Sequence, residues 1–258
     1  GRVVSDQEKI NILRRMLVGL DATDIDRLVI MPDSAMLGRA AINDGNFGFE
    51  IQLLDMTVFS VERDSIRAAE IMSDMGVDCL ITLGGDGTNR AVSLGSKGVP
   101  LVAVSTGTNN VFPDMVEGTL AGLAAGVVAA GLVDRDKVTT SSKRIEIWVD
   151  GVFTDVALVD LAVSKERFVG ARAIWDMATV HEVFLSQTGA SNLGMSAIGA
   201  QLHPEPLGDD EGMHVCIGLG GPTVRAAIAP GMVAHVNVDR WAVVKTGERI
   251  PIDLRPCT

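Results

Sequence analysis

Residues 77–88 read Val-Asp-Cys-Leu-Ile-Thr-Leu-Gly-Gly-Asp-Gly-Thr, and this stretch decides the fold. Residues 77–83 are mostly apolar and predict a buried strand, the glycines break it, and a short helix is predicted from Thr88 to about Leu94. Glycine permits backbone conformations and close approaches that a Cβ would prevent. The stretch therefore predicts a strand–loop–helix unit in which Thr88 caps the helix, whose free N–H groups form an anion site.

A second polar loop, Ser-Thr-Gly-Thr-Asn-Asn at residues 105–110, follows the next predicted strand, residues 101–104. It precedes a long apolar helix predicted from Asp114 to about Leu132. Because consecutive parallel strands end at one edge of a sheet, we expect both loops to share a crevice. There Asp86 could accept a proton or hydrogen bond from a hydroxyl, or hold a divalent metal on phosphates. A purely structural interpretation also stands for each loop, as a tight turn that caps the following helix.

Strands alternate with helices throughout the first half of the chain. Ser5 and Glu8 form a capping-box pattern at the start of a predicted helix. Strands are predicted at residues 27–31 and 51–54, and a further helix at residues 65–75. This alternation predicts an α/β domain with a parallel sheet, residues 1–138.

The pattern changes after residue 138. Predicted strands at residues 144–149 and 152–163 are joined by Asp150-Gly151, a strong hairpin signal. A helix is predicted over residues 167–184 and a surface loop over residues 205–212. Short strands with turns between them follow, at residues 213–219, 223–228, 232–238, 241–244 and 250–254. Residues 139–258 are therefore predicted to form a mostly antiparallel, β-rich domain.

Composition limits the possible partners. The 258 residues include 22 Lys plus Arg and 33 Asp plus Glu, a formal charge of −11. This excess excludes broad nucleic-acid binding, which needs a basic surface, but allows a phosphorylated ligand held by backbone amides. The apolar stretch at residues 119–133 is too short for a membrane span, so no membrane partner and a cytoplasmic location are predicted.

Cysteine and histidine positions give no sign of a metal site. The three cysteines are scattered, which is typical of a reduced compartment without disulfides. Cys79 and Cys216 lie in apolar predicted strands, where structural burial is the favoured interpretation. The four histidines show no ligand spacing, and no metal-binding residue is predicted.

Three segments together resemble a known superfamily. Residues 84–88 resemble the signature loop of the NAD kinase and diacylglycerol kinase superfamily, and residues 105–110 resemble its second loop. The third segment, Thr-Gly-Ala-Ser-Asn-Leu-Gly-Met-Ser-Ala at residues 188–197, is similar to the Thr-Gly-Ser-Thr-Ala-Tyr-x-x-Ser-Ala stretch of NAD kinases, and residues 201–204 continue the similarity. Nearly the whole chain is most similar to the AcoX-type, acetoin-catabolism members. The resemblance implies an α/β nucleotide-binding domain followed by a β-rich, β-sandwich-like domain.

The resemblance also implies an activity and roles for residues. The activity is ATP-dependent transfer of a phosphoryl group, with Mg²⁺, to a hydroxyl of NAD or a related metabolite. Asp86 would be catalytic, and Asp160, Thr188 and Ser191 would line the acceptor's ribose. The nucleotide-binding residues would be Gly84, Gly85, Gly87, Thr88, Thr106, Gly107, Thr108, Asn109 and Asn110. By the same analogy the protein would be a homo-oligomer, with one further strand before Gly1 and another after Thr258.

Two departures leave alternatives open. Val159 stands where NAD kinases carry the Asn that precedes their acidic residue, and Leu193 stands in place of their Tyr. Losing an amide and an aromatic ring from one pocket weakens the prediction of NAD as substrate. The alternatives are a non-catalytic nucleotide-binding regulatory protein and, from the Gly-Thr-Asn at residues 107–109, a lipid kinase.

Overall fold

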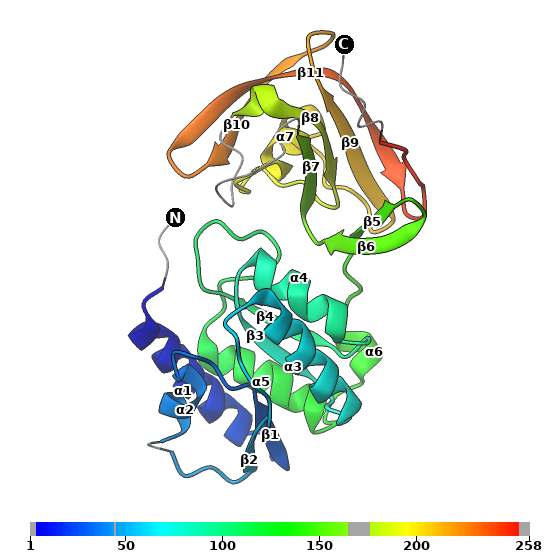
Figure 1. Ribbon diagram of the computed structural model, residues 1–258. Helices are drawn as coiled ribbons and strands as arrows, with labels where there is room; N and C mark the ends of the chain where they lie inside the picture. Colours follow the sequence, from blue (N-terminus) through cyan, green and yellow to red (C-terminus); the bar gives the residue numbers. More distant parts are fainter. Residues whose placement is uncertain (1–3, 44, 165–175, 253–258) are drawn as a thin grey trace. The chain divides into compact units, whose positions relative to one another are not determined.

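The computed structural model describes residues 4–43, 45–164 and 176–252. The chain divides into two compact units, Gly1–Ser141 and Ser142–Thr258, which are called the N-terminal and C-terminal units below. Each unit has its own elements and its own hydrophobic core (Figure 1). Each is described by itself.

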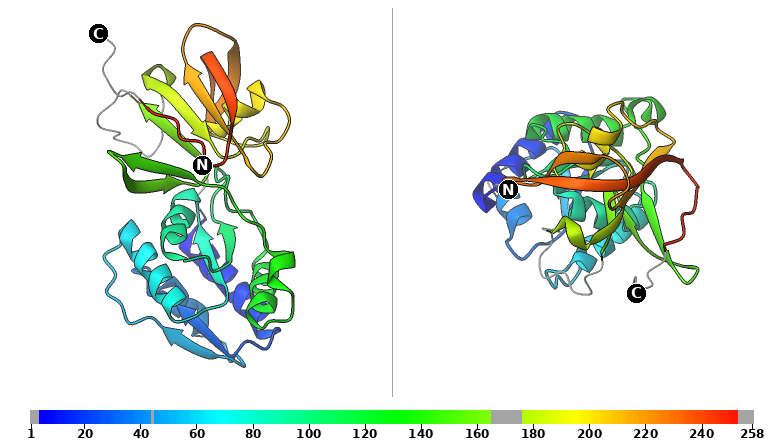
Figure 2. Two further views of the ribbon diagram at one scale, coloured as in Figure 1. Left: turned by 90° about the vertical axis from the view of Figure 1, so that its right-hand side faces the viewer. Right: turned by 90° about the horizontal axis from the view of Figure 1, so that it is seen from above.

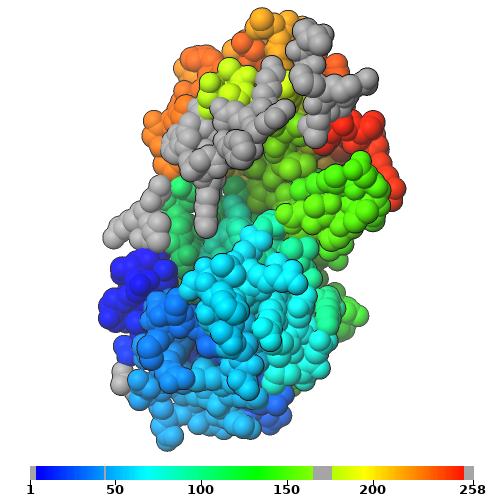
Figure 3. All heavy atoms as spheres, viewed as in Figure 1, coloured from blue at the N-terminus to red at the C-terminus, as the bar shows by residue number. Residues whose placement is uncertain are grey.

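The N-terminal unit alternates helices and strands, as the sequence predicts. The strands form two parallel pairs, β1 with β2 and β3 with β4. The segment from α2 through α3, coloured blue to cyan, forms much of the face of this unit that Figure 3 presents. In chain order the elements are α1 (Asp6–Asp21), β1 (Arg27–Ile30), α2 (Leu37–Ile42), β2 (Glu50–Leu53), α3 (Glu62–Asp74), β3 (Leu80–Gly84), α4 (Asp86–Gly95), β4 (Leu101–Ser105), α5 (Gly118–Ala129) and α6 (Arg135–Val138).

Alternating strand residues face two different helical layers. Leu80 of β3 and Leu101 of β4 pack with residues of α3 and α4. Their neighbours Ile81 and Val102 pack instead with residues of α1 and α5. Because successive side chains of a strand point to opposite faces, the parallel strands form the middle layer of an α/β unit.

Glycines of α5 let the backbones of α1 and α5 come into direct contact. A Cβ on Gly122 of α5 would overlap the carbonyl oxygen of Met16 of α1, and one on Gly126 would overlap the Thr23 side chain. The Gly/Ala-rich stretch of the sequence therefore packs its small side against α1, while Leu120 is 59% exposed. No helix among the described residues has the length and apolarity that crossing a membrane would require.

Helix starts agree with the sequence in one case and differ in another. The Ser5 hydroxyl accepts a hydrogen bond from the Glu8 backbone N–H, which confirms the predicted cap of α1. The prediction that α5 begins at Asp114 is wrong. The backbone of Asp114 instead pairs with Val104 beside β4, and α5 begins only at Gly118, capped by Glu117.

The C-terminal unit is built on an antiparallel sheet of five strands in the order β10-β11-β9-β8-β7. A separate hairpin pairs β5 with β6 through Asp150 and Gly151, both of which have positive φ angles, so the predicted hairpin is confirmed. The elements are β5 (Ile145–Val149), β6 (Val152–Ala157), β7 (Asp160–Ser164), the 3-10 turn η1 (Met177–Thr179), β8 (Val180–Leu185), α7 (Ser196–Leu202), β9 (Glu211–Ile217), β10 (Thr223–Ala229) and β11 (Met232–Lys245).

The core of this unit lies between α7 and one face of the sheet. Ile198 of α7 is fully buried against branched side chains such as Val183 of β8 and Val215 of β9. β11 is one continuous strand, as the right view of Figure 2 shows. Its first half pairs with β10 and its second half with β9, and a bulge lies next to Asp239, where the sequence predicts a break between two strands.

Three further predictions in this unit need correction. Residues 152–163, predicted as one strand, form β6 and the start of β7, which belong to different sheets. Residues 180–184, predicted as helix, belong to strand β8, which pairs with β7 and β9 and whose Val183 and Leu185 alternate into the core. Of the rest of that predicted helix, residues 167–175 lie outside the described residues, and residues 177–179 form the 3-10 turn η1. Residues 250–252 form no strand, and residues 253–254 are not described. The predicted fold class, an α/β unit with parallel strands followed by a β-rich unit, is confirmed.

Candidate functional site

The first loop, residues 84–88, joins the end of β3 to the start of α4. Gly85 is the N-cap of α4, and the prediction that Thr88 caps this helix is wrong. Thr88 lies in the first turn, and its side chain packs over Gly84, where a Cβ would lie 2.6 Å from the Thr88 Oγ1. Glycine is therefore required at position 84 because a threonine side chain occupies the space.

The start of α4 is open to a ligand. No side chain caps this helix within the described part of the chain. Gly87 is exposed, and no atom lies within 4 Å of the position of its missing Cβ. Backbone N–H groups of a first helical turn have no partner inside the helix and carry a partial positive charge. This end of α4 therefore has the chemistry of a phosphate site.

Asp86 connects α4 to the segment that follows the second loop. Its Oδ1 accepts hydrogen bonds from the backbone N–H groups of Phe112 at 2.8 Å and Val111 at 3.1 Å. Burial raises the pKa of the Asp86 carboxyl above its ordinary value, and the two amide hydrogen bonds oppose that rise. The carboxylate is thus partly withdrawn from water and is more basic than an ordinary surface aspartate.

The second loop, residues 105–110, is held together by its own polar groups. The Ser105 hydroxyl donates to the Gly107 carbonyl at 2.8 Å and accepts from the Asn110 amide at 2.8 Å. The Thr108 hydroxyl donates to the Asn109 side-chain oxygen at 3.1 Å. Thr106 also donates its backbone N–H to the Gly84 carbonyl at 3.3 Å. These bonds fix the loop beside the end of β3.

The two loops touch through Gly85 and Asn110. A Cβ on Gly85 would lie 2.6 Å from the Asn110 Oδ1, so the absence of a side chain at Gly85 makes this contact possible. The structure therefore brings Asp86, the first-loop glycines and the second-loop amides together in the N-terminal unit, as the order of the parallel strands predicts.

Asn89, which the sequence patterns did not single out, holds the first loop in place through side-chain hydrogen bonds. Its side chain is fully buried. The Asn89 Oδ1 accepts from the Thr82 hydroxyl at 2.6 Å, and its Nδ2 donates to the Gly85 carbonyl at 2.9 Å. The only sequence signal is that Asn89, a carboxamide, directly follows residues 84–88 and lies in a helix whose buried face is otherwise formed by small or apolar residues.

The remaining predicted site residues lie in the C-terminal unit. Asp160 is half-buried at the start of β7, and Gly194, with a φ of 101°, passes close to its carboxylate. Thr188 packs its methyl group against Gly199 of α7, whereas Ser191 is exposed. The structure thus brings Gly194 of the third segment near Asp160, but it places Thr188 against α7 and Ser191 at the surface.

The residues that depart from the NAD kinase pattern have different surroundings. Val159 is 6% exposed, and its carbonyl accepts both the backbone N–H and the hydroxyl of Ser186. Leu193 is half-buried. Ser196, at the start of α7, is fully buried, and its Oγ has no hydrogen-bond partner in the described part of the chain.

The donor set of the two loops suits a magnesium–nucleotide complex. Asp86 is the single carboxylate in the two loops, which contain no Lys or Arg. Mg²⁺ is commonly bound by one or two carboxylates together with phosphate oxygens and water. Oδ2 of Asp86 accepts a single long hydrogen bond, from Val111 at 3.2 Å, which leaves acceptor capacity for a cation.

Comparison with known families agrees with this architecture. The sequence model of the ATP-NAD kinase N-terminal domain matches residues 22–132, and that of the acetoin catabolism protein X C-terminal domain matches residues 143–258. The chain is therefore an NAD kinase-like protein whose two halves match two different domain families.

A curated relative gives the particular family. The acetoin catabolism protein X of Cupriavidus necator is 37% identical, and the match covers 93% of this chain and 71% of that protein. The chain belongs to the acetoin catabolism protein X family. No solved structure matches it.

Proposed function

We propose that this protein is an ATP-dependent small-molecule kinase, which transfers a phosphoryl group to a hydroxyl of NAD or a related metabolite. The observation that carries the proposal is the uncapped start of α4, with Gly87 open to solvent and Asp86 one residue before it. The family match to an ATP-NAD kinase domain and the name of the curated relative support the reaction class and a connection with acetoin catabolism. A cytoplasmic location and a homo-oligomeric state stay predictions.

In this proposal the backbone of the first loop binds phosphate. The N–H groups of Gly87 and Thr88 point out of the first turn of α4 and donate to phosphate oxygens. The Asn109 and Asn110 carboxamides offer both donors and acceptors to the nucleotide. Because the loops contain no basic side chain, neutralisation of the phosphates falls to these amides and to Mg²⁺, which lowers the repulsion between negative charges when bound.

Asp86 is placed to act on the acceptor. A carboxylate whose pKa is raised by burial accepts a proton from an attacking hydroxyl more readily than an ordinary aspartate does. Its hydrogen bonds to Val111 and Phe112 fix the direction of the carboxylate. Positioning and charge stabilisation supply most of the rate enhancement in phosphoryl transfer, so a fixed carboxylate matters more than a mobile one.

One observation favours a second function, a nucleotide-binding regulator without catalysis. Both oxygens of Asp86 already accept backbone hydrogen bonds, so the same carboxylate can serve to hold the loops together. Val159 and Leu193 also remove an amide and an aromatic ring that NAD kinases carry at the matching positions. Phosphate binding is common to both functions, and turnover separates them.

The binding step is tested by calorimetric titration of the protein with ATP and Mg²⁺, comparing wild type with Gly87→Asp. The new carboxylate repels phosphate, while the open space around Gly87 and the helix dipole tolerate it. We expect an affinity about 10- to 100-fold lower, from about 1.4–2.8 kcal/mol of lost interaction, and an unchanged or higher melting temperature.

Gln7→Glu is the matched control, because it adds the same charge at the second position of α1. It should leave ATP affinity unchanged. Equal ATP affinity in Gly87→Asp and wild type would contradict the assignment of the phosphate site.

Turnover is then measured with NAD and a panel of hydroxyl-bearing metabolites, with product detected by phosphorus NMR. Asp86→Asn should lower the turnover number by about 10²- to 10⁴-fold while ATP still binds. If ATP binds but no acceptor gives a phosphorylated product, the kinase function is rejected and the function of a nucleotide-binding regulator remains.

A further inference from the structure

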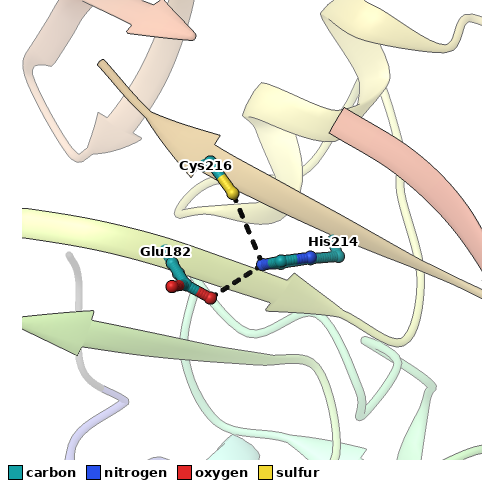
Figure 4. A group of neighbouring side chains, drawn as sticks. All are labelled: Glu182, His214 and Cys216. Atoms are coloured by element: carbon teal, nitrogen blue, oxygen red, sulfur yellow. Dashed lines mark hydrogen bonds and ion pairs between the residues drawn. The ribbon is translucent and has the colours of Figure 1, made fainter. Parts of the chain in front are cut away.

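Three potential metal ligands meet on adjacent strands of the C-terminal unit. Glu182 lies on β8, and His214 and Cys216 lie on β9 (Figure 4). In the antiparallel register Glu182 is directly opposite Cys216, and Phe184 is opposite His214. Residues two apart on a strand share a face, so all three side chains project from the same side of the sheet.

That side is the one turned away from α7. The alternate residues Val183, Met213 and Val215 are 0–1% exposed in the core that contains α7. The opposite side is nevertheless sheltered at this place: the Glu182 and His214 side chains are 23% and 17% exposed, and Cys216 is 8% exposed. Polar side chains kept from water need partners, and here they find them mainly in one another.

The donor atoms converge on one point. The His214 Nε2 lies 2.8 Å from the Glu182 Oε2 and 3.6 Å from the Cys216 Sγ, and the three ligand atoms all lie within 4.8 Å of one another (Figure 4). The Phe184 ring stacks on the imidazole, with centroids 4.4 Å apart and planes 3° apart, which fixes the plane of the histidine.

This arrangement differs from that of a nucleophilic cysteine assisted by histidine and glutamate. Such a relay uses one imidazole nitrogen for the nucleophile and the other for the carboxylate. In this cluster the same nitrogen, Nε2, faces both the sulfur and the carboxylate. Three donors around one centre are the pattern of coordination instead.

We propose that Glu182, His214 and Cys216 bind one Zn²⁺ ion, with water in the fourth position. Thiolate and imidazole together select a borderline-soft ion over Mg²⁺ or Ca²⁺, which prefer oxygen ligands, and zinc commonly takes three protein ligands plus water. The thiolate and the carboxylate balance the two positive charges of the ion.

Binding requires small changes that the site allows. The Cys216 thiol releases its proton to solvent as the sulfur–zinc bond forms. The His214 Nε2, which donates to the Glu182 carboxylate, gives up its proton while the neutral ring takes one from solvent at Nδ1, and the freed lone pair binds zinc in place of the hydrogen bond to Glu182. Zinc ligands at about 2.0–2.3 Å from the ion are separated by about 3.3–3.8 Å. The histidine–glutamate pair therefore opens by about 0.5 Å, and the sulfur–nitrogen distance already lies in this range. Burial raises the pKa of the Cys216 thiol, and the charge of Arg240 of β11, opposite Cys216 in the register, opposes that rise.

The test uses the full chain, stripped of metal and then titrated with Zn²⁺ in competition with a chromophoric chelator. We expect one equivalent bound, and Cys216→Ser should lower the affinity on the order of 100-fold. Cys79→Ser is the matched control, because it removes a free cysteine of the other unit. Burial raises the pKa of the Cys79 thiol to about 11, which keeps it neutral. The Cys79→Ser variant should therefore bind zinc as the wild type does.

A second measurement on the wild-type protein needs no variant. Bound Co²⁺ should show a sulfur-to-metal charge-transfer band in the near ultraviolet, together with visible bands typical of four ligands. Less than one equivalent of zinc at saturation, cobalt spectra without the sulfur band, or equal loss of affinity in both serine variants would each overturn the proposal. Far-ultraviolet circular dichroism confirms that the variants compared are folded.

Discussion

The two units gather their polar residues in opposite ways. In the N-terminal unit, Asp86 and Asn110 come from loops at the ends of two parallel strands. In the C-terminal unit, Glu182, His214 and Cys216 lie within two antiparallel strands. The first kind of cluster is visible in the sequence, because a parallel sheet collects its strand ends at one edge. The second kind depends on the register between strands whose residues lie more than thirty positions apart.

The two cores differ as well. The C-terminal core is filled by branched aliphatic side chains between α7 and the sheet. In the N-terminal unit, α1 and α5 meet through glycines at near-backbone distance. One core should therefore be sensitive to removing atoms and the other to adding them.

The largest effect is expected from Ile198→Ala in the C-terminal core. Ile198 is fully buried, so the substitution leaves a cavity and should lower the free energy of unfolding by about 3–4 kcal/mol. Denaturant unfolding gives the size, and hydrogen exchange should show the loss within residues 142–258. Val233→Ala, at a site 61% exposed, should change stability by less than about 0.5 kcal/mol. Equal losses in the two variants would show that this core is not packed as described.

The next effect is expected from Gly122→Ala in the N-terminal unit. The added methyl group would overlap the Met16 carbonyl and force α1 away from α5, at a cost of about 2–3 kcal/mol. Hydrogen exchange should report the change within residues 1–141. Ala124→Leu adds more atoms on the exposed side of the same helix and should be nearly neutral. A neutral Gly122→Ala would remove the contrast between the two cores.

Asp86 should show a smaller effect whose size depends on the replacement. Asp86→Ala leaves the Val111 and Phe112 N–H groups without their partner, whereas the amide oxygen introduced by Asp86→Asn still accepts from them. We expect the alanine variant to be about 1–2 kcal/mol less stable than the asparagine variant. Thermal unfolding measures the difference, and equal stability would mean that the carboxylate does not hold the loops together.

The same residue should make stability depend on pH. Because burial raises the pKa of Asp86, the folded protein binds that proton more tightly than the unfolded chain does. The stability linked to this proton is complete below the unfolded pKa and is lost as the pH rises through the folded pKa. Asp86→Asn should therefore be more stable than wild type above the folded pKa and equal to it below the unfolded pKa. Unfolding curves across this acidic range test the sign, and a gap that widens toward low pH would contradict it.

The smallest effect is expected from Gly87→Ala. No atom lies within 4 Å of the added Cβ, and alanine favours helix over glycine, so stability should rise by about 0.5 kcal/mol. The result contrasts with Gly122→Ala, since the same substitution in two helices should have opposite signs. A loss of stability in Gly87→Ala, measured by the same unfolding experiment, would show that the start of α4 is more crowded than the structure indicates.

Sequence patterns predicted the N-terminal unit better than the C-terminal unit. The strand–loop–helix order around Asp86 depends on local apolar runs and glycines, and it is confirmed. The helix predicted over residues 167–184 is wrong at residues 180–184, because the apolar residues of β8 fit both periods and contacts with β7 and β9 decide between them. The break between two strands predicted near Asp239 is a bulge within β11 for a similar reason. The strand continues past Asp239 because its second half pairs with β9.

The sequence by itself determined the alternation of elements, the two loops, the hairpin turn at Asp150 and Gly151, and the family resemblance, because each of these depends on residues close together in the chain. Only the tertiary structure decided that Asn89 supports the first loop, that Asp86 is bonded to Val111 and Phe112, and that Glu182 meets His214 and Cys216. These pairings follow from packing and register. Both depend on the whole fold, because they bring together residues that no local pattern links.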